Sequence, residues 1–367
     1  MAKKNPADFI IIFSVVLLTS LGIIMVFSAS QYSAGIRFND DFYFLKGQLR
    51  WAVLGFIVMG VASKFPYKKL RKFSKIILLI CIILLIVVLI PGLGRNVKGA
   101  TRWIGIGPFT LQPSEVVKLG MIIFMADSLS KKREEIRTFS KGILPYLALA
   151  LLVCGLIFVE PDLSTSVVVA GIIFAMMFVA GANLKHIVGL GSLSIPVLGV
   201  LIATASYRLK RFTSFLNPWE DIAGDGYQVV QSLLALGSGG LFGQGLGNGK
   251  QKLLYIPEAQ NDFILAHIGE ELGLIGTVTI LFLFMLLIWR GIRIALHAPD
   301  MFASLFACGI VFMIGFQVLI NVAVVTSFMP VTGMPLPFIS AGGSSLVFLL
   351  GGIGVLLNIS RYTKLDS

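Results

Sequence analysis

The run FIIIFSVVLLTSLGIIMVF, residues 9–27, contains apolar and small polar side chains and no charged residue. A helix needs about 20 such residues to cross the hydrocarbon core of a bilayer. The apolar core of a cleaved signal peptide is shorter, roughly 7–15 residues, although SAS at 28–30 resembles a cleavage site. Because comparable runs recur downstream, we interpret residues 9–27 as an uncleaved first membrane helix.

The composition extends this interpretation to the whole chain. Of the 367 residues, 56% are hydrophobic and only 13% are charged, and the mean hydropathy is +0.91. Soluble domains average about 25% charged residues, so this chain has too little charge to face water on all sides. The sequence predicts an all-α polytopic membrane protein with about ten transmembrane helices, roughly at residues 9–29, 47–63, 76–91, 114–129, 142–159, 164–182, 186–205, 272–290, 302–325 and 342–360.

Lysine and arginine in the short loops orient these helices. The segments KFPYKKLRKFSK (64–75) and SKKREEIRTFSK (130–141) carry six and five of them, and loops of this kind face the cytoplasm. Both chain ends fall on the same side, so we predict that both termini are cytoplasmic. Anionic lipid headgroups account for the net charge of +12. We therefore expect membrane lipids as partners and no nucleic acid.

The longest loop, residues 206–271, lies on the outer side between the seventh and eighth predicted helices. Loops of this length are usually functional or disordered, and this one is rich in aromatic residues, Gly and Pro. We predict short helices on the outer membrane surface, within a single membrane domain that covers residues 1–367. Basic residues in outer loops oppose the usual charge bias, which indicates an anionic ligand. The candidates for binding it are Lys46, Arg50, Arg102, Arg208, Lys210, Arg211 and Lys250.

The motif QPSEVVK, residues 112–118, opens the fourth predicted helix. Glu115 alone would be explained as a first-turn carboxylate that the helix dipole favours. Lys118 needs another explanation, because an intramembrane lysine is costly and is usually paired or functional. The spacing places Glu115 and Lys118 on one helix face, and we predict a functional pair that binds substrate.

Two further outer segments contain candidate substrate-binding residues. In EPDLS, residues 160–164, Glu160 and Asp162 either cap helix ends or are functional, and Asp162 is the candidate for binding substrate. PVTGMPLPFISAGGSS, residues 330–345, is a rigid proline-rich loop that ends in small residues. Its Ser344 and Ser345 allow either plain helix packing or a close approach of substrate.

The glycine-rich segment GSGGLFGQGLGNGK, residues 237–250, lacks the spacing of a nucleotide phosphate loop. It is either a turn that lets backbones approach closely or a cradle for a lipid-linked phosphate. His267, Glu270 and Glu271 share one helix face, but their pattern is not that of a zinc enzyme. We expect the two glutamates to cap or solvate the start of the eighth helix.

Asp262 lies in YIPEAQNDFILAHIGEELG, residues 255–273, directly before the apolar run FILA. A carboxylate beside an apolar wall loses water, which raises its pKa toward the range useful for proton transfer. A loop aspartate is otherwise most often a solvated turn residue. The residues alone leave both interpretations open.

Taken together, QPSEVVK, PDLST, SFLNPWED, GYQVVQSLLALGSGGLFGQGLG, YIPEAQNDFILAHIGEELG and GMPLPFISAGGSS resemble the motifs of the shape, elongation, division and sporulation family, in the same order. The resemblance covers nearly the whole chain and is closer to the FtsW and SpoVE branch than to RodA. Its members polymerise lipid II into peptidoglycan at the outer face of the bacterial cytoplasmic membrane. The resemblance implies that Asp262 is the catalytic aspartate and that Glu115 and Lys118 are functional.

Some positions depart from the family pattern. Asn261 stands where Thr commonly precedes the aspartate, and His267 replaces an aliphatic residue. Ala341 replaces a Tyr and Ser164 replaces a Gly. Gly47 stands where a basic residue often occurs, so Lys46 and Arg50 are the flanking substitutes for a family basic site.

The family chemistry implies an inverting glycosyltransferase, used for cell division or spore cortex synthesis. One displacement with one base suffices, so Asp262 would take the proton of the acceptor hydroxyl while undecaprenyl pyrophosphate leaves. A divalent cation, Mg²⁺ or Mn²⁺, would assist, and we expect no nucleotide, haem or zinc. The alternatives are a lipid II flippase and a non-catalytic membrane scaffold.

The resemblance also implies a separate crosslinking partner, a class B penicillin-binding protein with one membrane helix. We expect no Ser-x-x-Lys transpeptidase signature on a soluble domain of this chain, and tails too short to hold such a domain. Small residues favour close packing of helices in lipid. We predict that the partner docks on a glycine-containing face formed by Gly273, Gly276, Gly309 and Gly315.

Overall fold

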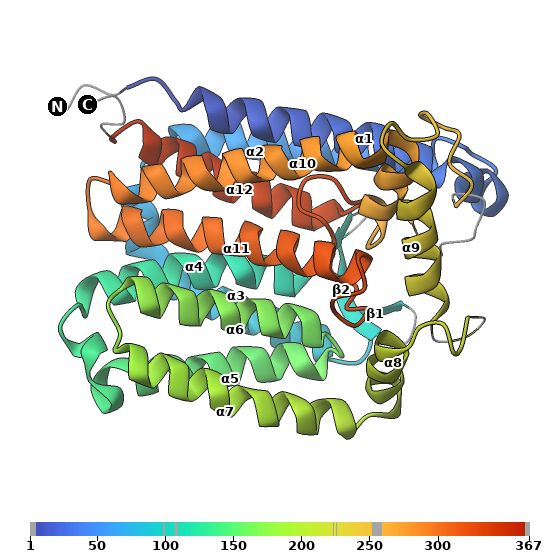
Figure 1. Ribbon diagram of the computed structural model, residues 1–367. Coiled ribbons are helices and arrows are strands. Elements are labelled where there is room, and N and C mark those ends of the chain that lie inside the picture. The colour runs from blue at the N-terminus through green and yellow to red at the C-terminus, as the bar shows by residue number, and fades with distance from the viewer. Residues whose placement is uncertain are drawn as a thin grey trace.

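The computed structural model describes residues 5–97, 100–106, 109–222, 224, 226–251 and 259–363. Its main body is a bundle of long helices that run between two ends of the molecule (Figure 1). This confirms the prediction of an all-α polytopic membrane protein. The long helices are α1 (Phe9–Phe38), α2 (Tyr43–Lys64), α3 (Tyr67–Leu89), α4 (Pro113–Lys131), α5 (Leu144–Val159), α6 (Leu163–Val179), α7 (Leu184–Ala203), α10 (Ile264–Leu296), α11 (Met301–Val325) and α12 (Gly343–Ser360).

Each of the ten predicted spans falls on one of these helices. Among the described residues, eight helical segments are long and apolar enough to cross a membrane. The other two long helices do not meet this description, because α6 has only 17 residues and α4 contains several charged side chains, including Glu115 and Lys118. The span count of ten therefore stays a prediction.

Several helices begin or end away from their predicted boundaries, among them α3, which begins at Tyr67 rather than near residue 76. α1 continues to Phe38, where Asn39 in the left-handed region ends it. α10 begins at Ile264 rather than near residue 272, and its backbone breaks at Gly273, with φ 66° and ψ −165°. A side chain at Gly273 would overlap the backbone of Leu241 and Gly243. The break therefore lets the glycine-rich segment cross α10 at close range.

A small antiparallel sheet joins α3 to α4, and the sequence did not predict it. Its strands are β1 (Gly94–Val97), β2 (Ala100–Ile106) and β3 (Phe109–Leu111), with β2 in the centre. Ile104 is paired with Gly94 on one side and with Leu111 on the other. The strands are short, so no long alternating pattern signalled them. The sheet matters because β2 carries Arg102.

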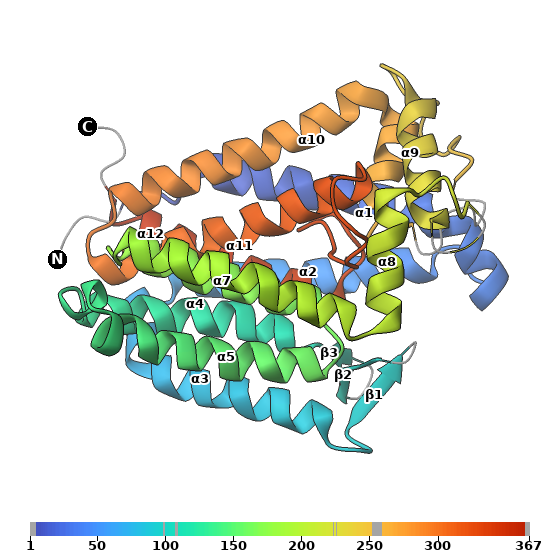
Figure 2. The same ribbon diagram turned by 60° about the horizontal axis from the view of Figure 1, so that its bottom comes forward.

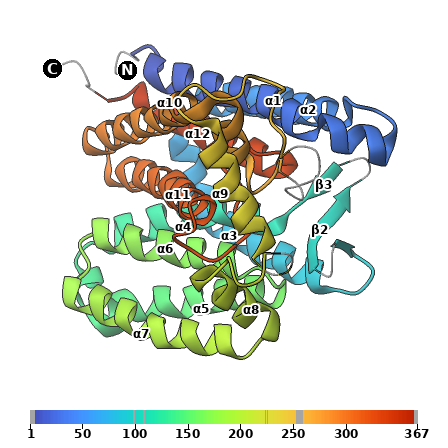
Figure 3. The ribbon, with the colours of Figure 1, turned by 45° about the vertical axis from the view of Figure 1, so that its right-hand side comes forward.

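The outer end of the bundle contains two short helices, as expected for the long loop. These are α8 (Ser206–Leu216) and α9 (Tyr227–Gly239), which lie across the direction of the long helices (Figure 2). The view of this end shows α9 crossing the end of α11 (Figure 3). Ser232 of α9 anchors it there, since its hydroxyl donates to the Val325 oxygen at 2.8 Å.

The first and last described residues of the chain lie together at the opposite end of the bundle (Figure 1). The Asn5 backbone N–H donates to the Arg361 oxygen at 2.9 Å, and its side-chain amide donates to the Thr363 oxygen. The turn between α2 and α3 and the connection from α4 to α5 lie at this same end. The arrangement agrees with two cytoplasmic termini.

Burial differs sharply between the helices. Most residues of α12, α4 and α11 are buried, whereas α7 has no buried residue along its length. α4, α11 and α12 therefore form the centre of the bundle, and α7 lies at its edge, where its apolar side chains face lipid. This loosely packed edge borders a cavity that Leu198 and Ile202 of α7 help to line.

Candidate active site

Asp262 lies in the turn that leads into α10, and residues 263–266 after it are buried. The apolar wall predicted beside this carboxylate is therefore present. Asn321 of α11 donates from its amide nitrogen to the backbone oxygens of Asp262 and Met334, both at 2.8 Å. One side chain thus ties the Asp262 turn to the segment between α11 and α12.

That connecting segment, residues 326–342, holds the Asp262 turn from a second point. The Ser340 hydroxyl donates to the backbone oxygen of Asn261 at 2.6 Å. Gly333 has a positive φ of 76°, and a Cβ built there would lie 3.4 Å from Asp262 Oδ2. The carboxylate therefore faces the backbone of the segment at Gly333.

A cavity of about 580 Å³ opens beside this segment. That volume is in the range of pockets that bind organic ligands, about 300–1,000 Å³. Its walls come from β2, α6, α7, α8, the end of α11 and the segment after it. Apolar side chains of the long helices form one part of the lining: Leu163, Val167, Leu198, Ile202 and Ile320.

Three arginines line the outer part of the cavity. Arg102 of β2 donates to the backbone oxygens of Glu160, at 3.1 Å from Nε, and of Pro161. Arg208 of α8 donates to the Leu201 oxygen and stacks its guanidinium 4.4 Å from the Phe158 ring centre. Their alkyl and guanidinium groups combine a hydrophobic contact with a fixed positive charge.

Arg211 of α8 connects the cavity to the Asp262 region. Its guanidinium donates to the Val331 oxygen at 3.4 Å, and Ser164 of α6 donates to the Thr332 oxygen. Val331 and Thr332 both line the cavity, and the next residue, Gly333, faces Asp262. The catalytic candidate therefore faces Gly333, the residue that directly follows the cavity-lining Val331 and Thr332.

The remaining predicted cations lie outside the cavity lining. Lys46 forms an exposed ion pair with Asp40 at 2.8 Å, and its hydrogen bond holds the pKa of Asp40 below its usual value. Arg50 donates to the Lys46 backbone oxygen and is exposed. Lys210 is exposed on α8, and Lys250 is exposed near α10. The prediction that these four side chains bind substrate gains no support from their positions.

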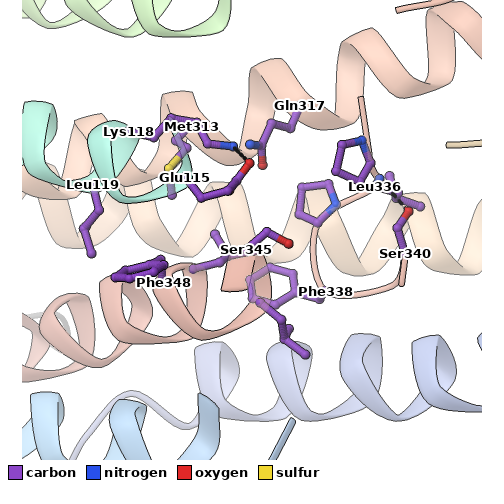
Figure 4. Close-up of a pocket in the computed structure, with 14 residues that line it drawn as sticks. Glu115, Lys118, Leu119, Met313, Gln317, Leu336, Phe338, Ser340, Ser345 and Phe348 are labelled. Atoms are coloured by element: carbon purple, nitrogen blue, oxygen red, sulfur yellow. Dashed lines mark hydrogen bonds and ion pairs between the residues drawn. The ribbon is translucent and has the colours of Figure 1, made fainter. Parts of the chain in front are cut away.

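Glu115 and Lys118 form the predicted pair on α4, with Lys118 Nζ 2.8 Å from Glu115 Oε1. Both side chains are buried, with exposures of 9% and 2%. The pair faces the Gln317 amide of α11 (Figure 4). The surrounding space measures only about 20 Å³, enough for about one water molecule. Glu115 and Lys118 are therefore separate from the large cavity, and direct contact with a lipid-linked sugar needs a change of shape.

The segment 326–342, which faces Asp262, also covers this small space. Ser340 and residues 335–338 line it, together with Ser345 of α12. The neighbouring Ser344 accepts a hydrogen bond from the Gln112 backbone N–H at 3.1 Å. Ser344 thus joins the start of α12 to the start of α4, which is a structural contact. Ser345 lies beside the ion pair.

Asp162 caps α6. Its carboxylate accepts hydrogen bonds from the Thr165 backbone at 3.1 Å and from the Thr165 hydroxyl at 2.9 Å. Gln112 adds a contact at 3.5 Å. Of the two interpretations left open by the sequence, the helix cap is present, and the buried carboxylate is already occupied by donors of the protein.

Glu270 and Glu271 are expected to cap or solvate the start of the eighth helix, and solvation is wrong because both side chains are buried. Glu270 accepts from the Lys250 backbone N–H at 2.7 Å, and Glu271 accepts from the hydroxyl of Ser28 in α1 and from Gly249 N–H. They anchor the glycine-rich segment to α10 and α1. Its backbone donors at these positions are occupied, which favours the turn over the phosphate cradle.

The sequence left the role of Glu160 open and did not place this residue, which ends α5, among the substrate-binding candidates. Its side chain is 0% exposed, and neither carboxyl oxygen has a hydrogen-bond partner in the described part of the chain. Burial raises the pKa of Glu160 to about 8, the nearby Asp162 adds to the rise, and Arg102 opposes it. In the sequence, Glu160 is an ordinary turn residue. Only the fold buries it beside the cavity wall.

The predicted divalent cation can be compared with the ligands that are available. Across the described ranges, no three His, Cys, Asp or Glu side chains gather in a group that could hold a metal ion. His267 lies 3.3 Å from Glu271, but that pair is enclosed and has no third ligand of this kind. The described side chains therefore offer no preformed site for Mg²⁺ or Mn²⁺, and the divalent cation stays a prediction.

Comparison with known proteins agrees with this geometry. Residues 8–365 match the family model for the cell cycle proteins FtsW, RodA and SpoVE. The chain is 49% identical to stage V sporulation protein E of Bacillus subtilis over 99% of both chains. It is 45% identical to a probable peptidoglycan glycosyltransferase FtsW of Geobacter sulfurreducens, over 97% of this chain and 96% of that protein.

Two solved structures share the fold. One is described as structural coordination of polymerization and crosslinking by a peptidoglycan synthase complex. It superposes with a TM-score of 0.81 at 30% identity, over 97% of this chain and 98% of that chain. The other is the rod shape determining protein RodA of Thermus thermophilus, with a TM-score of 0.71 at 29% identity and 98% coverage of both chains.

Proposed function

The chain belongs to the FtsW, RodA and SpoVE family of cell cycle proteins, and we propose that it polymerises lipid II as a peptidoglycan glycosyltransferase. It is a multi-pass protein of the cytoplasmic membrane, with the proposed reaction at the outer face. The observation that carries the proposal is the cavity of about 580 Å³, which joins an apolar wall to three arginines. Its lining ends at Thr332, next to Gly333, which faces Asp262. The relatives that carry the glycosyltransferase name support it.

The cavity matches the two halves of a polyprenyl pyrophosphate. Leu198 and Ile202 of α7, with Val167 of α6, offer an apolar surface near the outer ends of these two helices. Arg102, Arg208 and Arg211 lie at the outer end, where guanidinium groups suit phosphate oxygens in geometry and charge. A lipid tail would therefore lie along α6 and α7, with the pyrophosphate at the arginines.

In the proposed reaction, the 4-hydroxyl oxygen of the acceptor sugar attacks the anomeric carbon of the donor. The new carbon–oxygen bond forms as the bond from that carbon to the pyrophosphate oxygen breaks. Asp262 takes the hydroxyl proton, and the arginines stabilise the negative charge on the departing pyrophosphate. A single displacement inverts the anomeric centre, so no covalent enzyme intermediate is needed.

The contacts around Asp262 would keep the base in position. Asn321 and Ser340 hold the backbone on both sides of it, and Gly333 leaves room for the carboxylate. Glu115 and Lys118 would influence the position of Asp262 through the segment 326–342, because this segment faces Asp262 and also covers their ion pair. We assign the pair a positioning role in the closed shape and contact with substrate only after that segment moves.

The direct experiment is purified protein with lipid II in detergent, together with a lipid II transport assay in vesicles. We expect the wild type to produce glycan strands and the Asp262→Asn variant to produce none. Transport that persists in Asp262→Asn, with no glycan product from the wild type, would replace this proposal by the flippase alternative. A wild type without either activity would favour the scaffold alternative.

A crosslinking partner follows from the same comparison, because the first solved neighbour belongs to a peptidoglycan synthase complex. We infer a class B penicillin-binding protein with one membrane helix. The glycine face predicted for docking is wrong at Gly309, where an added Cβ would overlap Ile122 of α4 inside the bundle. Gly273 likewise meets the Gly243 backbone. Neither glycine lies on an outer face.

α10 offers a better docking face. Large apolar side chains repeat along its length at intervals of three and four residues, all exposed: Leu274, Val278, Phe282, Met285, Trp289, Ile292 and Leu296. Phe282→Ala with Met285→Ala should reduce co-purification of the partner from membranes. The exposed pair Val188→Ala and Leu193→Ala on α7 is the control. Equal loss in both variants would remove α10 as the docking face.

A further inference from the structure

Glu160 is a buried carboxyl that the proposed mechanism does not use. It ends α5 at the outer end of the bundle, outside the membrane-spanning segments, and is 0% exposed. Neither Oε1 nor Oε2 has a hydrogen-bond partner within the described ranges. A charged carboxylate buried without donors costs several kcal/mol, so this environment favours the neutral acid.

The nearest opposite charge belongs to Arg102, and it does not bind the Glu160 carboxyl. Instead, Arg102 donates to the backbone oxygens of Glu160 and Pro161. A guanidinium has five N–H donors, and Arg102 also lines the cationic cavity. The side chain therefore bridges the α5–α6 turn and the cavity, while an acid that could attract it lies within the same turn.

We propose that Glu160 is a positioning residue: its uncharged carboxyl leaves Arg102 at the cavity, and its carboxylate would draw that guanidinium away. The reason is the strength of a charge-assisted, bidentate arginine–carboxylate contact compared with hydrogen bonds to two carbonyl oxygens. This inference rests on the proposed function, because it takes the cavity to bind the pyrophosphate of a polyprenyl lipid. Arg102 then supplies one of three cations only while Glu160 is protonated.

Other charged groups around Glu160 set the direction of the effect. Asp162 of α6 disfavours a second negative charge, and Arg102 of β2 favours it. Arg208 stacks on Phe158, two residues before Glu160, and remains at the cavity. With a pKa raised to about 8, Glu160 is mostly neutral at pH 7 and mostly charged at pH 9. Ligand binding should therefore weaken as the pH rises through this range.

The binding experiment uses the full chain in lipid nanodiscs and undecaprenyl pyrophosphate as the probe. The neutral fraction of Glu160 falls about tenfold between pH 7 and 9, so the wild-type Kd should rise up to about tenfold. Glu160→Gln keeps the shape and stays neutral, so its Kd should remain near the wild-type value at pH 7 in both conditions. Glu220→Gln, an exposed outer carboxyl, is the matched control and should follow the wild type.

A double-variant cycle identifies Arg102 as the intermediary. Arg102→Gln should weaken binding at both pH values, and adding Glu160→Gln to it should change nothing further. Non-additivity of this kind is the sign of two residues that act on one contact. A role of Glu160 in folding alone would lower the yield of folded protein without a pH-dependent Kd.

A spectroscopic measurement reports the Glu160 proton without any ligand. The infrared C=O band of a protonated carboxylic acid should be present in the wild type at pH 7, should fade near pH 8 and should be missing in Glu160→Gln. If both the wild type and Glu160→Gln bind the probe and their Kd values respond equally to pH, the role of Glu160 is overturned while the cavity assignment stands. Failure of the wild type to bind the probe at either pH would overturn the cavity assignment and this inference together.

Discussion

Two buried carboxylates near opposite ends of the bundle have opposite surroundings. At the cytoplasmic end, Asp127 of α4 accepts hydrogen bonds from Arg71, Ser74 and Lys131 at 2.7–3.0 Å. At the outer end, Glu160 has no hydrogen-bond partner within the described ranges. Both residues are almost fully buried. Burial alone therefore does not separate a structural acid from a functional one, whereas the supply of donors does.

The outer end contains further buried polar atoms without partners. Among the described side chains these include the oxygens of Ser114 and Thr332 and the amide oxygen of Asn321. Such groups are costly and uncommon in stable interiors. They lie around the two cavities and the Asp262 turn, where water or a ligand can supply the missing hydrogen bonds. Atoms without a partner among the described residues also occur at the cytoplasmic end, for example His186 Nδ1 and Arg361 Nε, so the outer groups are distinguished by their position beside the cavities.

Among the changes that test the difference between the two ends, Asp262→Asn should have the largest effect on activity. It keeps the size and polarity of the side chain and removes its affinity for a proton. Polymerisation of lipid II should fall by about 10²–10⁴-fold, with unchanged thermal unfolding of the purified protein. Asp221→Asn, on the exposed outer loop, should keep the wild-type rate. Near-normal glycan chains from Asp262→Asn would remove the base assignment.

The Glu115–Lys118 pair tests the outer end in a second way. Lys118→Glu alone should abolish activity and destabilise the protein by about 3–5 kcal/mol, because it leaves buried like charges. The double swap, Glu115→Lys with Lys118→Glu, should restore folding but less than about a tenth of the activity, since Gln317 and Ser345 then face reversed charges. Full recovery of polymerisation in the swap would show that the pair is only structural.

Arg211 and Lys210 are adjacent cations on α8 with different positions. Arg211 lines the cavity and Lys210 does not, although both are exposed. Arg211→Gln should raise the KM for lipid II by about tenfold, the usual range for one charge-assisted contact. Lys210→Gln should change it less than twofold. Equal effects of the two variants would mean that α8 acts through its overall charge rather than through the cavity.

Asp127→Asn is expected to have the smallest effect on the rate. The change weakens the hydrogen bonds from Arg71 and Lys131, so the thermal midpoint of unfolding should fall. The kcat of the protein that remains folded should stay within about twofold of wild type, because this end of the bundle touches no part of the proposed reaction. A large loss of kcat without loss of stability would show that Asp127 is not a purely structural acid.

The sequence predicted the membrane part of the fold well, since each of the ten predicted spans lies on a helix. It also placed Asp262, Glu115, Lys118 and the arginines of the long loop among the candidates. It did not predict the sheet around Arg102, the early start of α10 or the burial of Glu270 and Glu271. These features depend on contacts between segments far apart in the chain, such as Ser28 with Glu271 at 2.7 Å.

By itself, the sequence determined the helical class, the orientation and the residues available for chemistry. Hydrocarbon requires long apolar runs with satisfied backbones, and lysine and arginine orient them, so both properties are local and readable. Only the tertiary structure decided which polar residues meet. It brought Arg102, Arg208 and Arg211 to one cavity. It also placed the Glu115–Lys118 pair beside a space of about 20 Å³ and buried the Glu160 carboxyl without a hydrogen-bond partner among the described residues. The reason is that the cost of a buried charge depends on which donors the fold places around it.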